Sequence, residues 1–273
     1  MNLTGLIGTP VRQSWSQRLF NEIYKIKKMD YFYAAIDLDI SSMAKFIGFA
    51  SSSMNGFNVT SPYKETILRH IEQRNPLVWR IGSANVITNE SGTLYAHNTD
   101  YSGFKRTLEA NNIEIDGKQI CIAGTGGVFK TILYCIFSDF TPKSVIVLSR
   151  EPERARTKFQ GFEYMEGAEI SGYPANGRFD IVINCTPLGT NEGDQSPVKS
   201  SNFSENAVAI DLLYARRSTK FLEVAKTANA TCINGREMFF QQALESYNLF
   251  HGDFPDMDVF AEVREGLEES ESR

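Results

Sequence analysis

Cysteine is scarce in this sequence of 273 residues, and long apolar runs are missing from it. Its four cysteines form no CxxC pair, so we expect neither a disulfide framework nor a bound metal ion. The apolar runs, such as residues 145–148, are far shorter than the roughly 20 residues that span a bilayer. The N-terminus has no basic segment leading into an apolar stretch, as a signal peptide would. These features predict a reduced, cytoplasmic protein.

The sequence also has no large excess of charge of one sign, because 28 basic residues against 33 acidic residues leave a net charge of only −5. Binding to nucleic acid depends on clustered Lys and Arg, so nucleic acid is not expected as the main partner. A small anionic ligand stays open, because it needs only a local basic pocket. The oligomeric state, monomer or homodimer, is left open as well.

The length favours two domains, and short apolar runs alternate with helical periods along the chain. We expect an α/β fold whose central part is a parallel sheet covered by helices. The predicted domains are residues 1–102 with 237–273, and residues 103–236. The predicted strands are residues 3–8, 31–38, 56–60, 84–88, 93–98, 119–123, 144–148, 179–184, 207–213 and 230–233. The predicted helices are residues 18–28, 43–50, 64–72, 100–111, 128–138, 153–159, 219–227, 236–250 and 257–268, and residues 190–206 read as a loop.

A glycine loop, Gly124-Thr-Gly-Gly-Val-Phe129, follows a predicted strand and opens a helix. Glycines allow the tight turn and let a pyrophosphate approach the backbone, while the helix N-terminus offers free N–H groups. The context predicts a dinucleotide site, although a strand–turn–helix without any ligand is the alternative. Phe129 departs from the pattern, which usually has Gly or Ala there.

The residues after the second strand of this region bear on the choice of dinucleotide. An acid there would bind the ribose 2′-hydroxyl of NAD, whereas an arginine would bind the 2′-phosphate of NADP. Arg150 and Arg154 favour NADP, and Glu151 argues for NAD. Arg154 alone could equally be a solvated helix charge.

Polar residues gather at strand ends in the first hundred residues. They include Ser14 and Ser16, Asn58 and Thr60, Lys64, Asn85, and Asp100. Hydroxyls, amides, one lysine and one aspartate suit a polyhydroxylated ligand that carries a carboxylate. Each serine or asparagine at a helix start could instead be a helix cap.

Taken together, these motifs resemble those of the shikimate dehydrogenase family, in order and over nearly the whole chain. The motifs are GTPVRQSWS (8–16), GFNVTSPYK (56–64), IGSAN (81–85), NTDYSGF (98–104), GTGG (124–127), SRE (149–151), NCTPLG (184–189), DLLY (211–214) with Thr219, and NGREM (234–238) with Gln242.

The resemblance implies a fold with an N-terminal α/β substrate domain, a Rossmann-type NADP-binding domain and a cleft between them. It implies the NADPH-dependent, reversible reduction of 3-dehydroshikimate to shikimate in the biosynthesis of aromatic amino acids. Lys64 and Asp100 would form the catalytic pair, since reduction of a ketone needs a proton donor within reach. Ser14 and Ser16 would bind the substrate carboxylate. The ring hydroxyls would be held by Asn58, Thr60, Asn85 and Gln242, with Tyr214 framing the pocket.

The resemblance also assigns the cofactor side. The implied NADP-binding residues are Gly124, Thr125, Gly126, Gly127, Val128, Ser149, Arg150, Arg154, Thr186, Leu212, Gly235 and Met238. Departures from the family pattern at Phe129, Glu151 and Glu237 leave rival interpretations open. One rival is an enzyme acting on quinate or aminoshikimate, or using NAD. The others are a ligand-binding paralogue with little turnover and a structural dinucleotide-binding protein.

Overall fold

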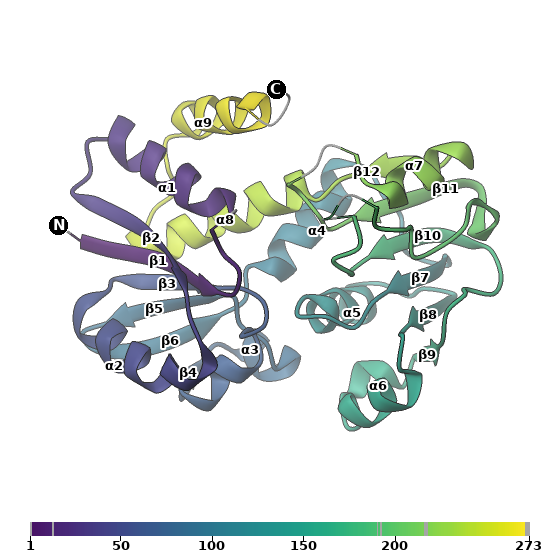
Figure 1. Ribbon diagram of the computed structural model, residues 1–273, viewed down its shortest axis with the longest axis horizontal. Coiled ribbons are helices and arrows are strands. Elements are labelled where there is room, and N and C mark those ends of the chain that lie inside the picture. Colours follow the sequence, from purple (N-terminus) through teal and green to yellow (C-terminus); the bar gives the residue numbers. More distant parts are fainter. Residues whose placement is uncertain (1, 13, 190, 192, 216–217, 271–273) are drawn as a thin grey trace. The chain divides into compact units, whose positions relative to one another are not determined.

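The computed structural model describes the chain except for residues 1, 13, 190, 192, 216–217 and 271–273 (Figure 1). The chain forms two compact units. Unit 1 comprises Met1–Gly103 and Phe240–Arg273, and unit 2 comprises Phe104–Phe239. Within the described residues, no helix combines the length and the apolar character needed to cross a membrane.

Unit 1 is built on a mixed six-stranded sheet in the order β2-β1-β3-β5-β6-β4. Its strands are β1 (Asn2–Gly8), β2 (Tyr31–Asp37), β3 (Gly56–Val59), β4 (Gln73–Arg74), β5 (Val86–Glu90) and β6 (Thr93–His97). The parallel strands β2, β1 and β3 meet an antiparallel hairpin, β5–β6, whose turn contains Gly92 at a positive φ of 92°. β3 is buried along its whole length, so Asn58 on it is held inside the unit.

Helices pack on this sheet from both ends of the sequence. They are α1 (Trp15–Ile26), α2 (Met43–Ser53), α3 (Pro76–Ile81), most of α8 (Arg236–His251), α9 (Met257–Ser270) and the start of α4 (Asp100–Ala110). α9, in yellow, lies beside α1, in purple, and Arg18 on α1 donates a 2.9 Å hydrogen bond to Ser270 (Figure 1). Both ends of the sequence therefore contribute helices to unit 1.

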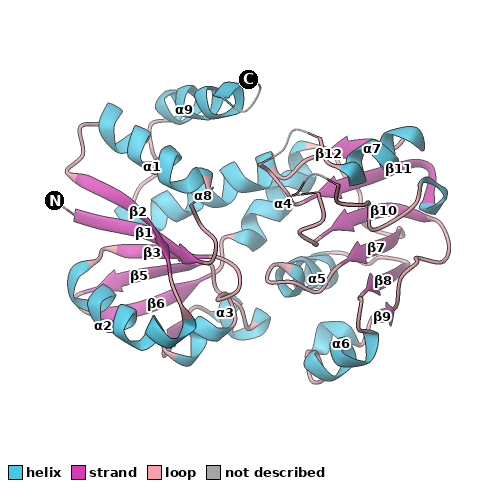
Figure 2. Cartoon of the chain, in the orientation of Figure 1, coloured by secondary structure: helices cyan, strands magenta, loops and turns pink. Residues whose placement is uncertain are grey.

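Unit 2 contains a six-stranded sheet in which every pairing is parallel, in the order β12-β11-β10-β7-β8-β9 (Figure 2). The strands are β7 (Gln119–Ala123), β8 (Ser144–Leu148), β9 (Ala168–Ser171), β10 (Phe179–Asn184), β11 (Phe203–Asp211) and β12 (Thr231–Ile233). Counted within the unit, this is the 3-2-1-4-5-6 order of a Rossmann sheet. Its helices include α5 (Phe129–Asp139), α6 (Pro152–Lys158) and α7 (Lys220–Thr227). The strand order reverses between β7 and β10, where ligands bind in such sheets.

Some predicted elements were wrong. Residues 64–72 form only a short 3-10 turn, Thr66–Arg69, because the Lys64 carbonyl accepts a 2.8 Å bond from Ala84 instead of joining a helix. The predicted loop 190–206 already enters β11 at Phe203, which pairs with Phe179 of β10; residues 190 and 192 lie outside the described residues. The sequence analysis also missed β4, β9 and α3, although Asn75 and Pro76 are a cap and first-turn signal for α3.

Candidate active site

Lys64 and Asp100 form a close ion pair within unit 1. Lys64 Nζ lies 2.6 Å from Asp100 Oδ2, and the two side chains are only 13% and 8% exposed. Lys64 follows β3 by five residues, and Asp100 is the first residue of α4. Both are brought together because the β5–β6 hairpin returns the chain to the end of β3. Few water molecules can screen this pair, so its attraction is stronger than that of a surface pair.

Asn85 fixes the carboxylate of this pair. Its Nδ2 donates to Asp100 Oδ1 at 3.2 Å and to Thr99 Oγ1 at 2.9 Å, and a longer 3.4 Å contact reaches Gln242 Oε1 on α8. Its Oδ1 accepts a 2.7 Å bond from the backbone N–H of Thr99, which sets the orientation of the amide. Asn85 thereby joins Asp100 to Gln242 in one network.

The Asn58 side chain makes more hydrogen bonds within the protein than the sequence suggested. Its Oδ1 accepts a 2.7 Å bond from the Tyr33 hydroxyl, and its Nδ2 donates to Ser246 Oγ at 3.0 Å and to the Asn85 carbonyl at 3.3 Å. Both amide hydrogens are used, so a ligand could bind Asn58 only through the remaining lone pair of Oδ1. Thr60 follows the end of β3, is partly exposed, and packs its methyl group over Gly8.

Ser14 and Ser16 open α1. Ser14 is its N-cap, since its Oγ accepts from the Ser16 backbone N–H at 3.3 Å. The two hydroxyls are also 3.2 Å apart, and Ser16 is 7% exposed. In this bond Ser14 Oγ is the donor and Ser16 Oγ the acceptor, so a carboxylate that took the Ser14 hydroxyl proton would replace the bond to Ser16.

The predicted substrate residues are divided between the two units. Gln242 is in unit 1, within the network around Asn85, whereas Tyr214 belongs to unit 2. The Tyr214 ring stacks on Phe239 at 4.4 Å, and its carbonyl accepts a 3.4 Å bond from Arg236 Nε. Unit 1 therefore gathers every predicted substrate residue except Tyr214, together with the catalytic pair.

The glycine loop of unit 2 turns where the sequence predicted. Gly124 has a φ of 94°, and a Cβ there would lie 2.6 Å from Thr186 Cγ2, so only glycine fits. Val128 is the residue before α5. Phe129, which departs from the glycine-loop pattern, is fully buried and packs on Phe159 with ring centroids 5.0 Å apart. Its side chain therefore fills the core and does not occupy the loop.

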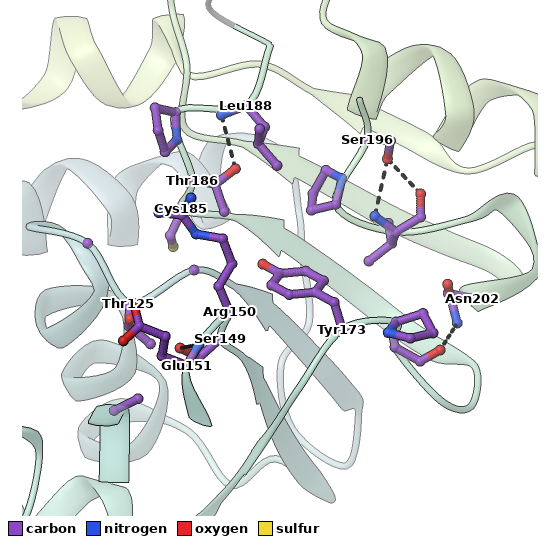
Figure 3. Close-up of a pocket in the computed structure, with 18 of the residues that line it drawn as sticks. Thr125, Ser149, Arg150, Glu151, Tyr173, Cys185, Thr186, Leu188, Ser196 and Asn202 are labelled. Atoms are coloured by element: carbon purple, nitrogen blue, oxygen red, sulfur yellow. Dashed lines mark hydrogen bonds between the residues drawn. The ribbon is translucent and has the colours of Figure 1, made fainter. Parts of the chain in front are cut away.

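A pocket of about 850 Å³ opens at the carboxyl ends of β7, β8 and β10 (Figure 3). It is lined by seven of the predicted cofactor residues, namely Gly124, Thr125, Gly126, Ser149, Arg150, Arg154 and Thr186. Figure 3 shows Arg150 and Tyr173 among the side chains that line it. Its volume is in the usual range for small-molecule and cofactor sites, and its glycines and cations suit a phosphorylated ligand. The residues present therefore fit a dinucleotide.

The other five predicted cofactor residues, Gly127, Val128, Leu212, Gly235 and Met238, are not among the lining residues. Gly235 packs on Leu212, since a Cβ at Gly235 would lie 2.4 Å from the Leu212 carbonyl oxygen. Met238 is buried at 7% exposure on α8, and Glu237 beside it is only partly exposed.

The sequence analysis missed a further set of lining residues. Lys158 ends α6, Tyr173 follows β9, and Ser196, Lys199 and Asn202 precede β11. A signal existed for Lys158, which lies four residues after Arg154 and therefore on the same helical face. No signal existed for the others, because the tertiary fold alone brings these loops to the pocket.

A buried polar anchor holds the Thr186 loop against the sheet. Asp211, at the end of β11, accepts bonds from the Thr219 hydroxyl, from Asn184 Nδ2 at 3.0 Å and from the Leu213 N–H at 3.2 Å. Asn184 Oδ1 in turn accepts from the Thr186 backbone at 3.0 Å and from its hydroxyl at 2.6 Å. Burial raises the pKa of Asp211 to about 6, although these hydrogen bonds oppose that shift.

The comparisons with known proteins agree with this geometry. Residues 6–87 match the family model of the shikimate dehydrogenase substrate binding domain. A shikimate dehydrogenase (NADP(+)) of Clostridium botulinum is 34% identical over 255 residues, covering 92% of this chain and 96% of the relative. The chain belongs to the shikimate dehydrogenase family. Residues 6–87 lie within unit 1 and include Lys64, whereas Asp100 follows the matched segment in the same unit.

Solved structures of shikimate dehydrogenases extend the match to the whole fold. One from Peptoclostridium difficile has a TM-score of 0.86 at 27% identity and covers 99% of both chains. Another, from Thermus thermophilus, was solved in complex with NADP(H) and shikimate and has a TM-score of 0.84 at 25% identity, covering 98% of this chain and 100% of that one. The chain thus has the shikimate dehydrogenase architecture, an N-terminal α/β domain plus a Rossmann-type domain.

Among the residues that the structure places, no group of three or more His, Cys, Asp or Glu side chains is arranged to hold a metal ion.

Proposed function

We propose that this chain is an NADP-dependent shikimate dehydrogenase, which reversibly reduces 3-dehydroshikimate to shikimate in the biosynthesis of aromatic amino acids. The observation that carries the proposal is the buried Lys64–Asp100 pair at 2.6 Å, in a chain 34% identical to a shikimate dehydrogenase (NADP(+)). The intact pair argues against a ligand-binding paralogue with little turnover.

The chemistry of the proposed site follows from its charges. NADPH, when bound, supplies the hydride, because no side chain can donate one. Lys64 Nζ gives a proton to the carbonyl oxygen as negative charge develops there, and takes it back in the reverse direction. Asp100 holds Lys64 in position and stabilises its charged form, and Asn85 holds Asp100 through the 3.2 Å bond.

The remaining predicted residues supply binding in this proposal. Ser14 and Ser16 bind the substrate carboxylate through their hydroxyls. The ring hydroxyls are bound by Asn58, Thr60, Asn85 and Gln242, and Tyr214 frames the site. On the cofactor side, Gly124 to Val128 receive the pyrophosphate, Ser149, Arg150 and Arg154 bind the adenosine end, and Thr186, Leu212, Gly235 and Met238 border the nicotinamide.

The proposal includes two domains with the boundaries that the sequence suggested, 1–102 with 237–273 and 103–236. The first domain binds the substrate in a cleft and the second binds NADP. We further propose a cytoplasmic location and a monomer or homodimer as the working form.

Steady-state kinetics with shikimate and quinate, each with NADP+ and NAD+, test this function. We expect the highest kcat/KM for shikimate with NADP+. A preference for quinate over shikimate would reject the proposed substrate, and a preference for NAD+ would reject the proposed cofactor. Thermal stabilisation by shikimate without any turnover would indicate the ligand-binding paralogue instead.

A further inference from the structure

One face of α6 forms a wall of the nucleotide pocket. The residues of this wall are Arg154, Ala155 and Lys158, which share one face of α6, and Glu151, the N-cap residue just before the helix. Arg156, on the same helix, is turned away, because it donates a 2.6 Å bond to the Ile170 carbonyl and pairs with Glu153. The wall therefore presents one acid and two cations to whatever occupies the pocket.

The acid on this wall reduces the attraction for phosphate. Glu151 Oε2 lies 3.3 Å from Arg154 Nη1, so part of the charge of Arg154 is directed toward Glu151. The two side chains are 65% and 79% exposed, and such an ion pair is weak enough for a phosphate dianion to replace it. A phosphate bound to Arg154 would still be repelled by Glu151 nearby, unless another cation offset that charge.

Lys158 is placed to be that cation. It lies one helical turn beyond Arg154 and lines the pocket, and its exposed side chain places Nζ 4.9 Å from the centroid of the Phe159 ring. Arg150 lines the same pocket from the end of β8. Arg150, Arg154 and Lys158 together with Glu151 leave a net positive charge of two on this side of the pocket, and Lys199 lines the pocket from the segment before β11.

We propose that Lys158 binds the 2′-phosphate of the cofactor and compensates for Glu151 in the choice of NADP over NAD. This inference rests on the proposed function and adds a specificity residue to it. The 2′-phosphate carries a near-dianionic charge that NAD lacks, so a lysine beside it favours NADP alone.

The test measures nucleotide binding by calorimetry on the whole chain without substrate. Adenosine 2′,5′-bisphosphate and adenosine 5′-monophosphate are the two ligands, because they differ only in the 2′-phosphate. We expect Lys158→Ala to weaken bisphosphate binding by about 10-fold or more and to change monophosphate binding less than about twofold. Lys158→Arg should bind both ligands like wild type. Lys143→Ala removes an exposed lysine outside the pocket and should change neither affinity.

A second variant tests the compensation. Glu151→Gln should strengthen bisphosphate binding several-fold, and the double variant Glu151→Gln with Lys158→Ala should bind the bisphosphate several-fold more tightly than Lys158→Ala alone. Unchanged bisphosphate binding in Lys158→Ala, or an equal loss for both ligands, would overturn the inference.

The outcome separates this inference from the proposed function. If Lys158→Ala selectively loses bisphosphate binding but the wild-type chain oxidises no shikimate, the function fails and the inference stands. If the wild type oxidises shikimate with NADP+ and Lys158→Ala binds the bisphosphate normally, the inference fails and the function stands.

Discussion

Two ion pairs of this molecule differ in exposure, and the difference separates a chemical site from a binding site. The Lys64–Asp100 pair in unit 1 is 13% and 8% exposed, whereas in unit 2 the side chains of Arg154 and Glu151 are 79% and 65% exposed. The first pair is fixed by Asn85 before any ligand arrives. The second can exchange its partner for a ligand at little cost. A proton donor is more effective when it is held in position before the substrate binds. A cation that binds phosphate must instead be able to leave its carboxylate partner when the ligand arrives.

The strongest test of the buried pair is Lys64→Ala. We expect kcat for shikimate oxidation to fall by about 10²- to 10⁴-fold with little change in KM, because the proton-transferring group is lost. Steady-state kinetics measure both constants. Lys45→Ala, which removes an exposed lysine of α2, is the matched control and should act like wild type. A wild-type kcat in Lys64→Ala would remove this lysine from the chemistry.

Asp100→Asn sharpens the comparison between buried and exposed pairs. It leaves the Lys64 charge buried without its carboxylate, so we expect a loss of about 3 kcal/mol in the free energy of unfolding, together with lower activity. Asp139→Asn breaks the Lys105–Asp139 pair, whose side chains are 40% and 15% exposed, and should cost about 1 kcal/mol or less. Denaturant unfolding compares the two. Equal losses would show that burial does not distinguish these pairs.

A matched pair of glycines tests the pocket in unit 2. Gly124 and Gly117 both have positive φ, 94° and 70°, but a Cβ at Gly117 meets no atom within 4 Å. Replacement of either glycine by alanine should lower the free energy of unfolding by about 1 kcal/mol or more, because alanine is strained at a positive φ. Only Gly124→Ala should also weaken NADP+ binding, by about 10-fold, because its methyl group displaces Thr186. Calorimetric NADP+ affinities that fall equally in both variants would contradict the assigned role of the loop.

The smallest expected effect is a pH dependence from Asp211. Its pKa is raised from 3.8 to about 6 by burial, so the folded state binds its proton more tightly than the unfolded chain. The contribution of Asp211 to the free energy of unfolding therefore falls as pH rises from about 4 to about 6, and is constant above that. Wild type should exceed Asp211→Asn in Tm by more at about pH 4 than at about pH 7. A difference that is the same at both pH values, or larger at the higher one, would reject this assignment.

Local sequence patterns predicted much of the fold but not all of it. The glycine loop after β7 was visible because Gly124 must adopt a positive φ, and the parallel sheet was visible in the alternation of short apolar runs with helical segments. The helix predicted for residues 64–72 was wrong because the Lys64 carbonyl accepts a hydrogen bond from the Ala84 N–H, and no local pattern indicates this contact.

The site shows the same limit. Motif resemblance named Lys64, Asp100 and Asn85, and the structure joins them by hydrogen bonds. Tyr173 stayed hidden because it reaches the pocket after β9, a four-residue strand with little sequence signal. The hydrogen bonds of Asn58 with Tyr33 and Ser246 could not be predicted either, because their partners lie on distant segments, β2 and α8.

We assign the chemistry to the buried pair of unit 1 and the choice of cofactor to the exposed pocket of unit 2. The most direct measurement compares kcat/KM for shikimate oxidation with NADP+ and with NAD+ in wild type and in Lys64→Ala. The prediction is a wild type that prefers NADP+ and a variant whose rates fall by the same factor with both cofactors, so that their ratio is unchanged. A wild type that oxidises no shikimate with NADP+, or a Lys64→Ala variant whose cofactor ratio shifts, would contradict it.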